Sequence, residues 1–314
     1  MTALRPLGSS VLNVFPLALG GNVFGWTADE TASFAVLDAY AAAGGNFIDT
    51  ADLYSAWVPG HQGGESETVI GNWLASRGNR SDVLVATKVG GHPRYKGLRA
   101  ATIKAGAEES LRRLRTDHID LYYTHFDDPE VPVEEIITAL DQLVKAGKVR
   151  AIGASNISAE RLAASLAFSE REGLARYAAL QPHYNLVSRD TYEGELQDTV
   201  AAHGLSAVPY FALASGFLTG KYRPGTTVDS ARAGRAATYL ESERGVKVLT
   251  ALDRIAGARG AAIASVALAW LAAQPTVVAP LASARTVEQL PALLAGAELK
   301  LSAEELAELT TASA

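Results

Sequence analysis

The sequence contains no cysteine in its 314 residues. This absence excludes disulfides, thiol nucleophiles and cysteine-ligated metals, and it is compatible with a reducing cytoplasm. A basic excess is missing as well: the formal net charge is -6, whereas nucleic-acid-binding surfaces are usually basic. We therefore expect a cytoplasmic protein that binds no nucleic acid and needs no metal ion.

Long hydrophobic runs are also missing. The longest apolar stretch, residues 261–273, is too short to cross a bilayer and carries Ser265. The N-terminal segment has no long apolar core, and Arg5 and Pro6 interrupt it early, which does not fit a signal peptide. We expect no membrane association, and we interpret residues 261–273 as a buried helix.

Short strand-like runs alternate with longer helical patterns along the whole chain. The predicted strands cover residues 17–19, 47–49, 83–87, 119–124, 149–153, 177–180, 205–209 and 276–280. The predicted helices cover residues 29–43, 65–76, 102–115, 133–146, 158–168, 190–203, 245–257, 261–273, 287–294 and 303–309, with Thr102 as an N-cap. Eight strand–helix units favour a closed parallel sheet over an open one. The prediction is a single α/β domain over residues 1–314, a (β/α)8 TIM barrel.

Two segments lie outside this repeat. Residues 4–15, with Gly8-Ser9-Ser10 in the middle, are typical of an N-terminal β-hairpin. Residues 211–245 follow the seventh strand and are too long for a structureless loop; loops of this length are usually lids or binding loops. Because the loops after barrel strands lie on the face that carries active sites, we expect this long loop to cover a binding site.

Four ionisable side chains follow the ends of three predicted strands: Asp49 and Tyr54, Lys88, and His125. Each has an ordinary explanation when taken alone. Asp49 could be a helix cap at about even odds, Lys88 a solvated surface residue, His125 a structural histidine and Tyr54 a packed loop aromatic. Strand ends converge at the mouth of a barrel, so the joint occurrence favours a shared site.

The four side chains offer a coherent chemistry. A buried Lys88 beside Tyr54 is expected to lower the pKa of the phenol by favouring the phenolate. Asp49 can hold Lys88 charged and oriented, which makes Tyr54 a usable proton donor near neutral pH. A neutral His125 can donate a hydrogen bond to a carbonyl oxygen and polarise the carbonyl. No covalent intermediate and no metal is needed.

Several motifs resemble one known family. They are DTADLY (49–54), GGESETVIGNWL (63–74), TKVG (87–90), IDLYYTHFDDP (119–129), VRAIGASNIS (149–158), QPHYNLVSR (181–189), GFLTGKY (216–222) and residues 266–290. In this order they resemble the aldo-keto reductase family over essentially the whole chain. The likeness is greatest to a bacterial branch with a long GFLTGKY loop, related to potassium-channel β-subunits.

The resemblance implies hydride transfer between NADPH and a carbonyl, with a catalytic tetrad of Asp49, Tyr54, Lys88 and His125 and with Tyr54 as the acid. It implies that Ser155, Asn156 and Gln181 hold the nicotinamide carboxamide and that Tyr210 stacks on the ring. The other implied cofactor residues lie at the first strand end, on the long loop and near the adenosine: Gly21, Asn22, Asp49, Phe211, Leu213, Ser215, Gly216, Lys221, Arg223, Ser283, Arg285 and Gln289.

The choice of NADPH over NADH depends mainly on Arg285. It lies after the eighth strand and just before a predicted helix, and a helix N-terminus with an arginine suits a phosphate. The alternative is a solvated arginine. No Gly-x-Gly-x-x-Gly follows the first strand, which excludes a Rossmann site. The sequence departs from the family pattern at Phe211, where serine is common, at Ser283, where glycine is usual, and at Leu293, where asparagine or glutamate often contacts adenine.

The substrate is predicted only as a class. The resemblance and the aromatic residues near the strand ends suggest that Trp26, Tyr54, Trp57, His125 and Phe126 contact a small-molecule aldehyde or ketone. The alternative function is an NADP(H)-binding regulatory or redox-sensing module with slow turnover. A phosphosugar-binding barrel would explain a phosphate site but not the four-residue set. We expect a monomer or a weak homo-oligomer.

Overall fold

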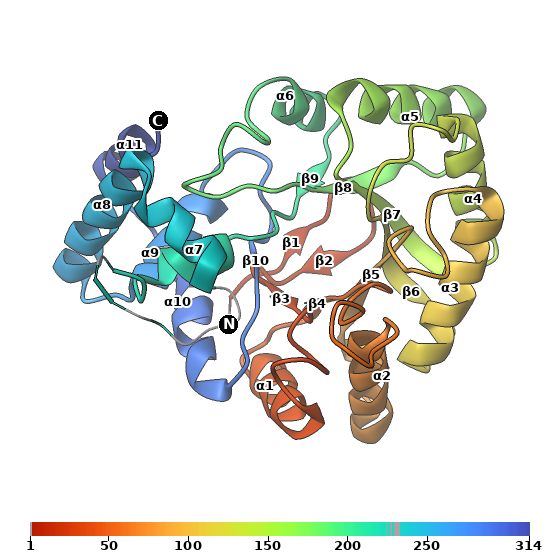
Figure 1. Ribbon diagram of the computed structural model, residues 1–314. Helices are drawn as coiled ribbons and strands as arrows, with labels where there is room; N and C mark the ends of the chain where they lie inside the picture. The colour runs from red at the N-terminus through yellow and green to blue at the C-terminus, as the bar shows by residue number, and fades with distance from the viewer. Residues whose placement is uncertain (1, 224, 227, 229–232) are drawn as a thin grey trace.

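The structure, a computed structural model, describes residues 2–223, 225–226, 228 and 233–314. Its main sheet has eight parallel strands in the order β10-β3-β4-β5-β6-β7-β8-β9, so sequence neighbours are also spatial neighbours. The strands are β3 (Ala18–Gly20), β4 (Phe47–Asp49), β5 (Leu84–Val89), β6 (Ile119–Thr124), β7 (Val149–Ser155), β8 (Tyr177–Gln181), β9 (Ser206–Ala207) and β10 (Leu281–Ala282). Helices surround the sheet on its outer side (Figure 1). The architecture confirms the predicted (β/α)8 barrel.

The segment before β10 connects the two ends of the sheet. The Ala207 amide in β9 donates to the Thr276 carbonyl (2.8 Å), and the Val278 amide donates back to Ala207 (3.0 Å). On its other side, β10 pairs in parallel with β3. The eighth strand was predicted at residues 276–280, but the regular pairing begins only at Leu281, because Pro280 has no amide hydrogen to donate to a ladder.

The predicted N-terminal hairpin is present and pairs β1 (Arg5–Pro6) with β2 (Asn13–Val14). Its apolar side chains join a cluster inside the barrel that includes Phe47 and Leu121. The turn needs Gly8, which has φ of +51° and lies so close to β8 that a Cβ atom would stand 2.1 Å from the Ala178 carbonyl oxygen. The hairpin therefore closes one end of the barrel.

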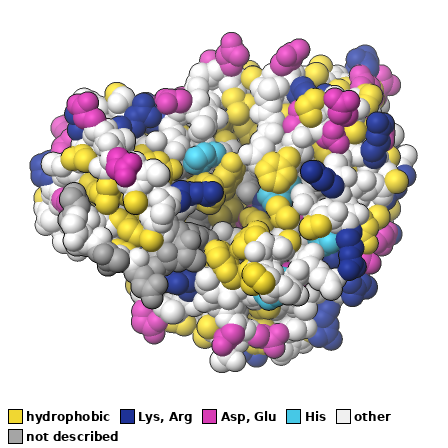
Figure 2. Space-filling model, viewed as in Figure 1, with side chains coloured by type: hydrophobic (Ala, Val, Ile, Leu, Met, Phe, Trp, Pro, Cys, Tyr) yellow, Lys and Arg dark blue, Asp and Glu magenta, His cyan; other side chains and the backbone are white. Residues whose placement is uncertain are grey.

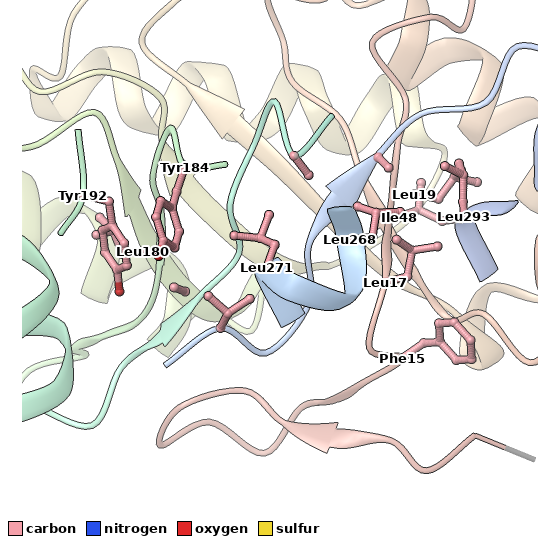
Figure 3. Close-up of a cluster of buried hydrophobic side chains, with 14 of the residues drawn as sticks. Phe15, Leu17, Leu19, Ile48, Leu180, Tyr184, Tyr192, Leu268, Leu271 and Leu293 are labelled. Carbon is pink, nitrogen blue, oxygen red and sulfur yellow. The ribbon is translucent and has the colours of Figure 1, made fainter. Parts of the chain in front are cut away.

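A larger core fills the space between the strands and the surrounding helices. Figure 3 shows part of this core, where Leu17 and Leu19 lie near Leu268 and Leu293. The helices are α1 (Glu30–Ala42), α2 (Glu65–Arg77), α3 (Ala100–Leu114), α4 (Val133–Lys145), α5 (Ala159–Glu172), α6 (Glu195–Ala202), α7 (Ala233–Leu240), α8 (Glu243–Arg259), α9 (Ile263–Ala272), α10 (Leu290–Glu298) and α11 (Ala303–Ala312). Thr102 is not a cap: α3 begins two residues earlier, after Arg99.

The long segment 211–245 is more ordered than a loop. It contains the 3-10 helix η2 (Ala214–Thr219), all of α7 and the start of α8. Helix α8 begins at Glu243, two residues before the predicted start, because the Ser242 hydroxyl caps it by accepting from the Gly245 amide (3.0 Å). Six positions of the segment, 224, 227 and 229–232, lie outside the described residues.

Helix α9 confirms the buried helix predicted for residues 261–273. Trp270 is fully buried, and the Ser265 hydroxyl donates to the Ala292 carbonyl (2.6 Å). Over the described part of the chain, no single helix has the length and apolar character to cross a membrane; α8 and α9 reach that length only together, with a bend of 103° between them.

Candidate functional site

The site begins with an ion pair between two neighbouring strands. Asp49 ends β4 and is opposite Ala86 in β5, and Lys88 stands two residues further along on the same face of the sheet. The Lys88 Nζ atom donates to Asp49 Oδ2 (2.7 Å), to the Thr50 carbonyl (2.7 Å) and to the Tyr54 hydroxyl (3.0 Å). These bonds use all three donors of the ammonium group, and Asp49 and Lys88 are both fully buried. The helix-cap interpretation of Asp49 and the solvated interpretation of Lys88 are therefore wrong.

A residue from the far side of the barrel completes the environment of Asp49. Gln181, the last residue of β8, donates its amide hydrogen to Asp49 Oδ1 (2.8 Å). The sequence indicated Gln181 only as a cofactor contact, so its bond to Asp49 is a role that sequence reasoning missed. No spacing signal relates positions 132 residues apart; only closure of the barrel brings them together.

The pKa of Tyr54 is higher than expected. Burial raises the pKa of the Tyr54 phenol to about 12, with Lys88 acting in the opposite direction. The prediction that Lys88 gives a lowered pKa is therefore wrong in its net direction, because the loss of water around the hydroxyl outweighs the nearby charge. Burial also acts to lower the pKa of Lys88, but Asp49 and Tyr54 raise it above its ordinary value, so the lysine stays charged.

His125 directly follows β6 and is 8% exposed. Burial, followed by the charge of Lys88, lowers its pKa well below the ordinary value, so the imidazole is neutral at physiological pH. Its ring lies 6.1 Å from the Tyr54 ring and stacks on Phe126 at 4.5 Å. The Tyr54 hydroxyl and a ring N–H of His125, which could both donate to a carbonyl oxygen, therefore belong to neighbouring side chains.

A cavity of about 370 Å³ extends away from Tyr54 toward Arg285. The face drawn in Figure 2 is hollowed near its centre, with hydrophobic side chains in the hollow and histidine and basic side chains at its rim. Of the predicted site residues, those lining the cavity are Asn22, Trp26, Tyr54, Tyr210, Phe211, Leu213, Ser215, Gly216, Lys221, Ser283, Arg285 and Gln289. The structure thus brings together residues from both halves of the chain.

Other predicted cofactor residues lie beside the cavity. The Gly21 amide donates to the Asp49 carbonyl (2.7 Å), and the Ser155 hydroxyl donates to the Gln181 carbonyl (2.8 Å). Asn156 accepts from the Tyr210 hydroxyl (2.8 Å). These bonds connect the ends of the first, second and later strands into one network around the ion pair of Asp49 and Lys88.

Arg223 is the predicted cofactor residue that the structure places elsewhere. It does not line the cavity, and its guanidinium forms two 2.7 Å bonds with the carboxylate of Asp253. An arginine held by a bidentate carboxylate is already neutralised. The position of Arg223, just after GFLTGKY, could not reveal this pairing, because Asp253 lies later in the chain, in α8.

The loop 211–223 provides the features that suit a pyrophosphate. Ser215 and Gly216 line the cavity and have left-handed φ values of +57° and +94°, so the backbone turns sharply there. Lys221 lies next to Gly216, and Arg285 also lines the cavity, just before the 3-10 helix η3 (Val287–Gln289). Among the described residues, neither cation has a carboxylate partner. This donor set fits a dinucleotide phosphate.

Several cavity residues carried no signal in the sequence. They are small or apolar: Val23, Thr27, Ala212, Thr219, Ala262, Ala264, Leu281, Ala282 and Ala292. Alanine and leucine are common core residues, and only the packing of α9 and α10 against the barrel turns them toward a cavity. Among the described residues, no three histidine or acidic side chains converge as metal ligands.

Aromatic rings form the entrance near Tyr54. Trp57 meets Trp26 edge-on at 5.5 Å and Tyr54 at 6.1 Å. Trp57 and Phe126 are 48% and 46% exposed, unusually open for such large apolar side chains. The predicted substrate residues Trp26, Tyr54 and Trp57 thus form one group of rings, and the ring of His125, which stacks on Phe126, is also a neighbour of Tyr54.

Comparisons with known proteins agree with this geometry. The family model described as "Aldo/keto reductase family" matches residues 16–314. The chain is 35% identical to norsolorinic acid reductase stcV of Emericella nidulans, over 98% of this chain and 79% of that protein. It is 35% identical to the uncharacterized oxidoreductase YrpG of Bacillus subtilis, over 96% and 92%. It is 32% identical to an aryl-alcohol dehydrogenase [NADP(+)] of Phanerodontia chrysosporium, over 94% and 81%. A buried Asp–Lys–Tyr set at the mouth of a parallel barrel and a family match over nearly the whole length lead to one conclusion: the chain belongs to the aldo/keto reductase family, as an NAD(P)H-dependent oxidoreductase that acts on carbonyl groups.

Proposed function

We propose that this protein is an NADPH-dependent reductase that converts aldehydes and ketones to alcohols, with Tyr54 as the general acid. The observation that carries the proposal is the 3.0 Å contact between Lys88 Nζ and the Tyr54 hydroxyl, inside a buried ion pair with Asp49. A lysine in this place favours the phenolate that forms when Tyr54 gives up its proton.

NADPH, when bound, supplies the hydride that reaches the carbonyl carbon. Tyr54 transfers its hydroxyl proton to the carbonyl oxygen, and the alcohol is complete. The phenolate left behind faces the Lys88 ammonium, whose other donors remain fixed by Asp49 and Thr50. The raised pKa does not oppose this step, because the alkoxide that develops on the substrate is a much stronger base than a phenolate.

His125 assists as a neutral hydrogen-bond donor. Its lowered pKa means that it carries no charge to compete with Lys88, and its ring borders the space over Tyr54. A neutral donor aimed at developing negative charge stabilises the transition state more than the ground state. Asp49 and Gln181 act through Lys88, by holding the ammonium in place.

The cofactor assignment to NADPH rests on Arg285. This arginine lines the cavity at the end far from Tyr54, precedes η3, and has no carboxylate partner among the described residues. Asn22, Ser283 and Gln289 would surround the adenosine, Lys221 and the Ser215–Gly216 turn the pyrophosphate, and Tyr210 the nicotinamide. The name of the relative from Phanerodontia chrysosporium, which includes NADP(+), supports the same choice.

The substrate class follows from the entrance. Trp26, Trp57 and Phe126 offer ring faces and edges to a flat apolar molecule. The relatives named norsolorinic acid reductase and aryl-alcohol dehydrogenase carry aromatic compounds in their names. Aromatic aldehydes and ketones are therefore the first substrates to assay.

The test is an NADPH-oxidation assay over a panel of aromatic aldehydes, aliphatic aldehydes and ketones, with NADPH binding followed separately by fluorescence. We expect turnover with at least the aromatic aldehydes and a strong preference over NADH. Tight NADPH binding without turnover of any carbonyl would contradict the reductase and support the regulatory alternative.

A further inference from the structure

Arg235 is a basic side chain beside the cavity that the proposed mechanism does not use. It belongs to α7, in the segment after β9, and its guanidinium carbon lies 5.2 Å from the centre of the Phe211 ring. Phe211 lines the cavity next to Tyr210, whose ring centre is 5.1 Å away. The arginine therefore stands over the aromatic wall of the site.

His183 lies on the same wall. Its ring stacks on Tyr210 with centroids 5.3 Å apart and meets Phe211 edge-on at 5.4 Å. Burial, and then the charge of Arg235, lowers the pKa of His183, so the imidazole is neutral. Its Nε2 atom is buried and has no hydrogen-bond partner among the described residues. A charged side chain, Arg235, and a neutral one, His183, thus both contact the Phe211 ring.

The positive charge of Arg235 is not neutralised within the described part of the chain. Other arginines of the same segment have carboxylate partners: Arg223 binds Asp253, and Arg244 binds Asp190. Arg235 has none there, and it is also absent from the residues that line the cofactor cavity. In a protein with a net charge of -6, an unpaired cation over Phe211 gives this wall of the site a local preference for anions.

Two hydrogen bonds connect this wall to the reacting centre. The Tyr210 hydroxyl donates to Asn156 Oδ1 (2.8 Å), and Asn156 Nδ2 donates to the His125 carbonyl (2.8 Å). A substrate that stacks at the entrance, with its carbonyl over Tyr54 and His125, would extend its far end toward the wall of Tyr210 and Phe211.

We propose that Arg235 and His183 form a recognition subsite for an anionic group, and that the enzyme prefers aromatic carbonyl substrates carrying a carboxylate remote from the carbonyl. Arg235 supplies the charge and the planar fork that matches a carboxylate, and His183 supplies a neutral donor through Nε2. This inference rests on the proposed function for the location of the carbonyl, and it assigns a specificity role to two residues outside the catalytic set.

The experiment compares two probes, 4-carboxybenzaldehyde and its methyl ester, which differ in the negative charge and in one methyl group. The measured quantity is the ratio of their kcat/KM values at neutral pH and low salt. In Arg235→Gln we expect this ratio to fall about tenfold, because the KM of the acid should rise while the KM of the ester should change little. Arg244→Gln is the matched control, because it removes the same charge from the same segment and should leave the ratio unchanged.

Additional measurements distinguish a failure of the subsite proposal from a failure of the proposed function. Because Arg235 is exposed, the wild-type ratio should decline as salt is added, while the ratio in Arg235→Gln should not. His183→Phe, which keeps the stacking and removes Nε2, should also lower the ratio. If the ratio is unchanged in Arg235→Gln, the proposal is overturned. If, in addition, the KM for NADPH rises in this variant, the arginine belongs to the cofactor site instead. Quenching of tryptophan fluorescence by each probe measures its binding affinity, and the ratio of the two affinities should change in the same way. This measurement tests the subsite even if the wild type reduces neither probe and the proposed function fails.

Discussion

The two ends of the cavity are built differently. At the Tyr54 end, Asp49 and Lys88 are fully buried and every donor of the lysine is used. At the other end, Arg285 and Lys221 are partly or fully exposed and have no carboxylate partner among the described residues. The first end is formed by residues of barrel strands, and the second is formed by residues of the segments that follow β9 and β10.

This difference reflects what each end has to do. A proton donor must have a fixed distance to the reacting atom, and a buried, fully bonded network holds it there without help from a ligand. A phosphate site must exchange its cofactor, so its cations are left for the ligand to neutralise. If this contrast is right, substitutions at the Tyr54 end should affect activity and stability most.

Replacing Tyr54 with phenylalanine should have the largest effect. The change removes the acid and keeps the ring, so kcat for carbonyl reduction should fall by about 10²- to 10⁴-fold. NADPH binding, measured by fluorescence, should remain close to that of the wild type. Retention of full activity would show that another group supplies the proton.

The substitution Asp49→Asn should damage both stability and activity. It leaves the Lys88 ammonium buried without a counter-charge, which we expect to lower the free energy of unfolding by about 3–5 kcal/mol. Urea denaturation measures this loss. Asp253→Asn breaks the half-exposed pair with Arg223 and should cost less than about 1 kcal/mol. Equal losses in the two variants would mean that the catalytic end is no more tightly built than the surface.

The substitution Arg285→Ala should weaken NADPH binding by about 10- to 100-fold through the loss of charge-assisted hydrogen bonds. NADH binding should change far less, since NADH has no 2′-phosphate. Arg223→Ala is the matched control and should leave both affinities nearly unchanged, because Arg223 is already bound to Asp253. Dissociation constants from fluorescence titration decide between the two arginines.

The smallest expected effect is that of pH on reduction. Burial raises the pKa of Tyr54 to about 12, so the phenol keeps its proton at any lower pH, and His125 remains neutral above its lowered pKa. For an uncharged aldehyde, kcat/KM should therefore vary by no more than about twofold between about pH 6 and pH 9. A falling limb near neutral pH would show that the phenol loses its proton much earlier than its burial implies.

The sequence predicted the fold well where local patterns are strong. The helix at residues 261–273 and the hairpin at residues 4–15 are both present, because apolar periodicity and turn glycines act over a few residues. Prediction failed where distant contacts decide. The eighth strand begins after Pro280, and α6 starts at Glu195 rather than at residue 190.

For the site, the sequence identified residues better than their environments. Asp49, Tyr54 and Lys88 do meet, as their positions near strand ends suggested. The net pKa of Tyr54, the bond from Gln181 to Asp49 and the pairing of Arg223 with Asp253 could not be predicted. Each depends on how much water is removed from a group, or on which side chain stands opposite it.

The sequence by itself determined the family, the barrel and the set of groups available for chemistry, because alternation of strands with helices and the types of side chain at strand ends are written locally along the chain. The tertiary structure alone decided which cations remain free for a ligand and how strongly each group holds its proton. The physical reason is that ion pairing and desolvation are properties of three-dimensional neighbours. Lys88 and Arg223 are held by carboxylates, whereas Arg285 lines the cavity and Arg235 lies over Phe211, both with no such partner among the described residues.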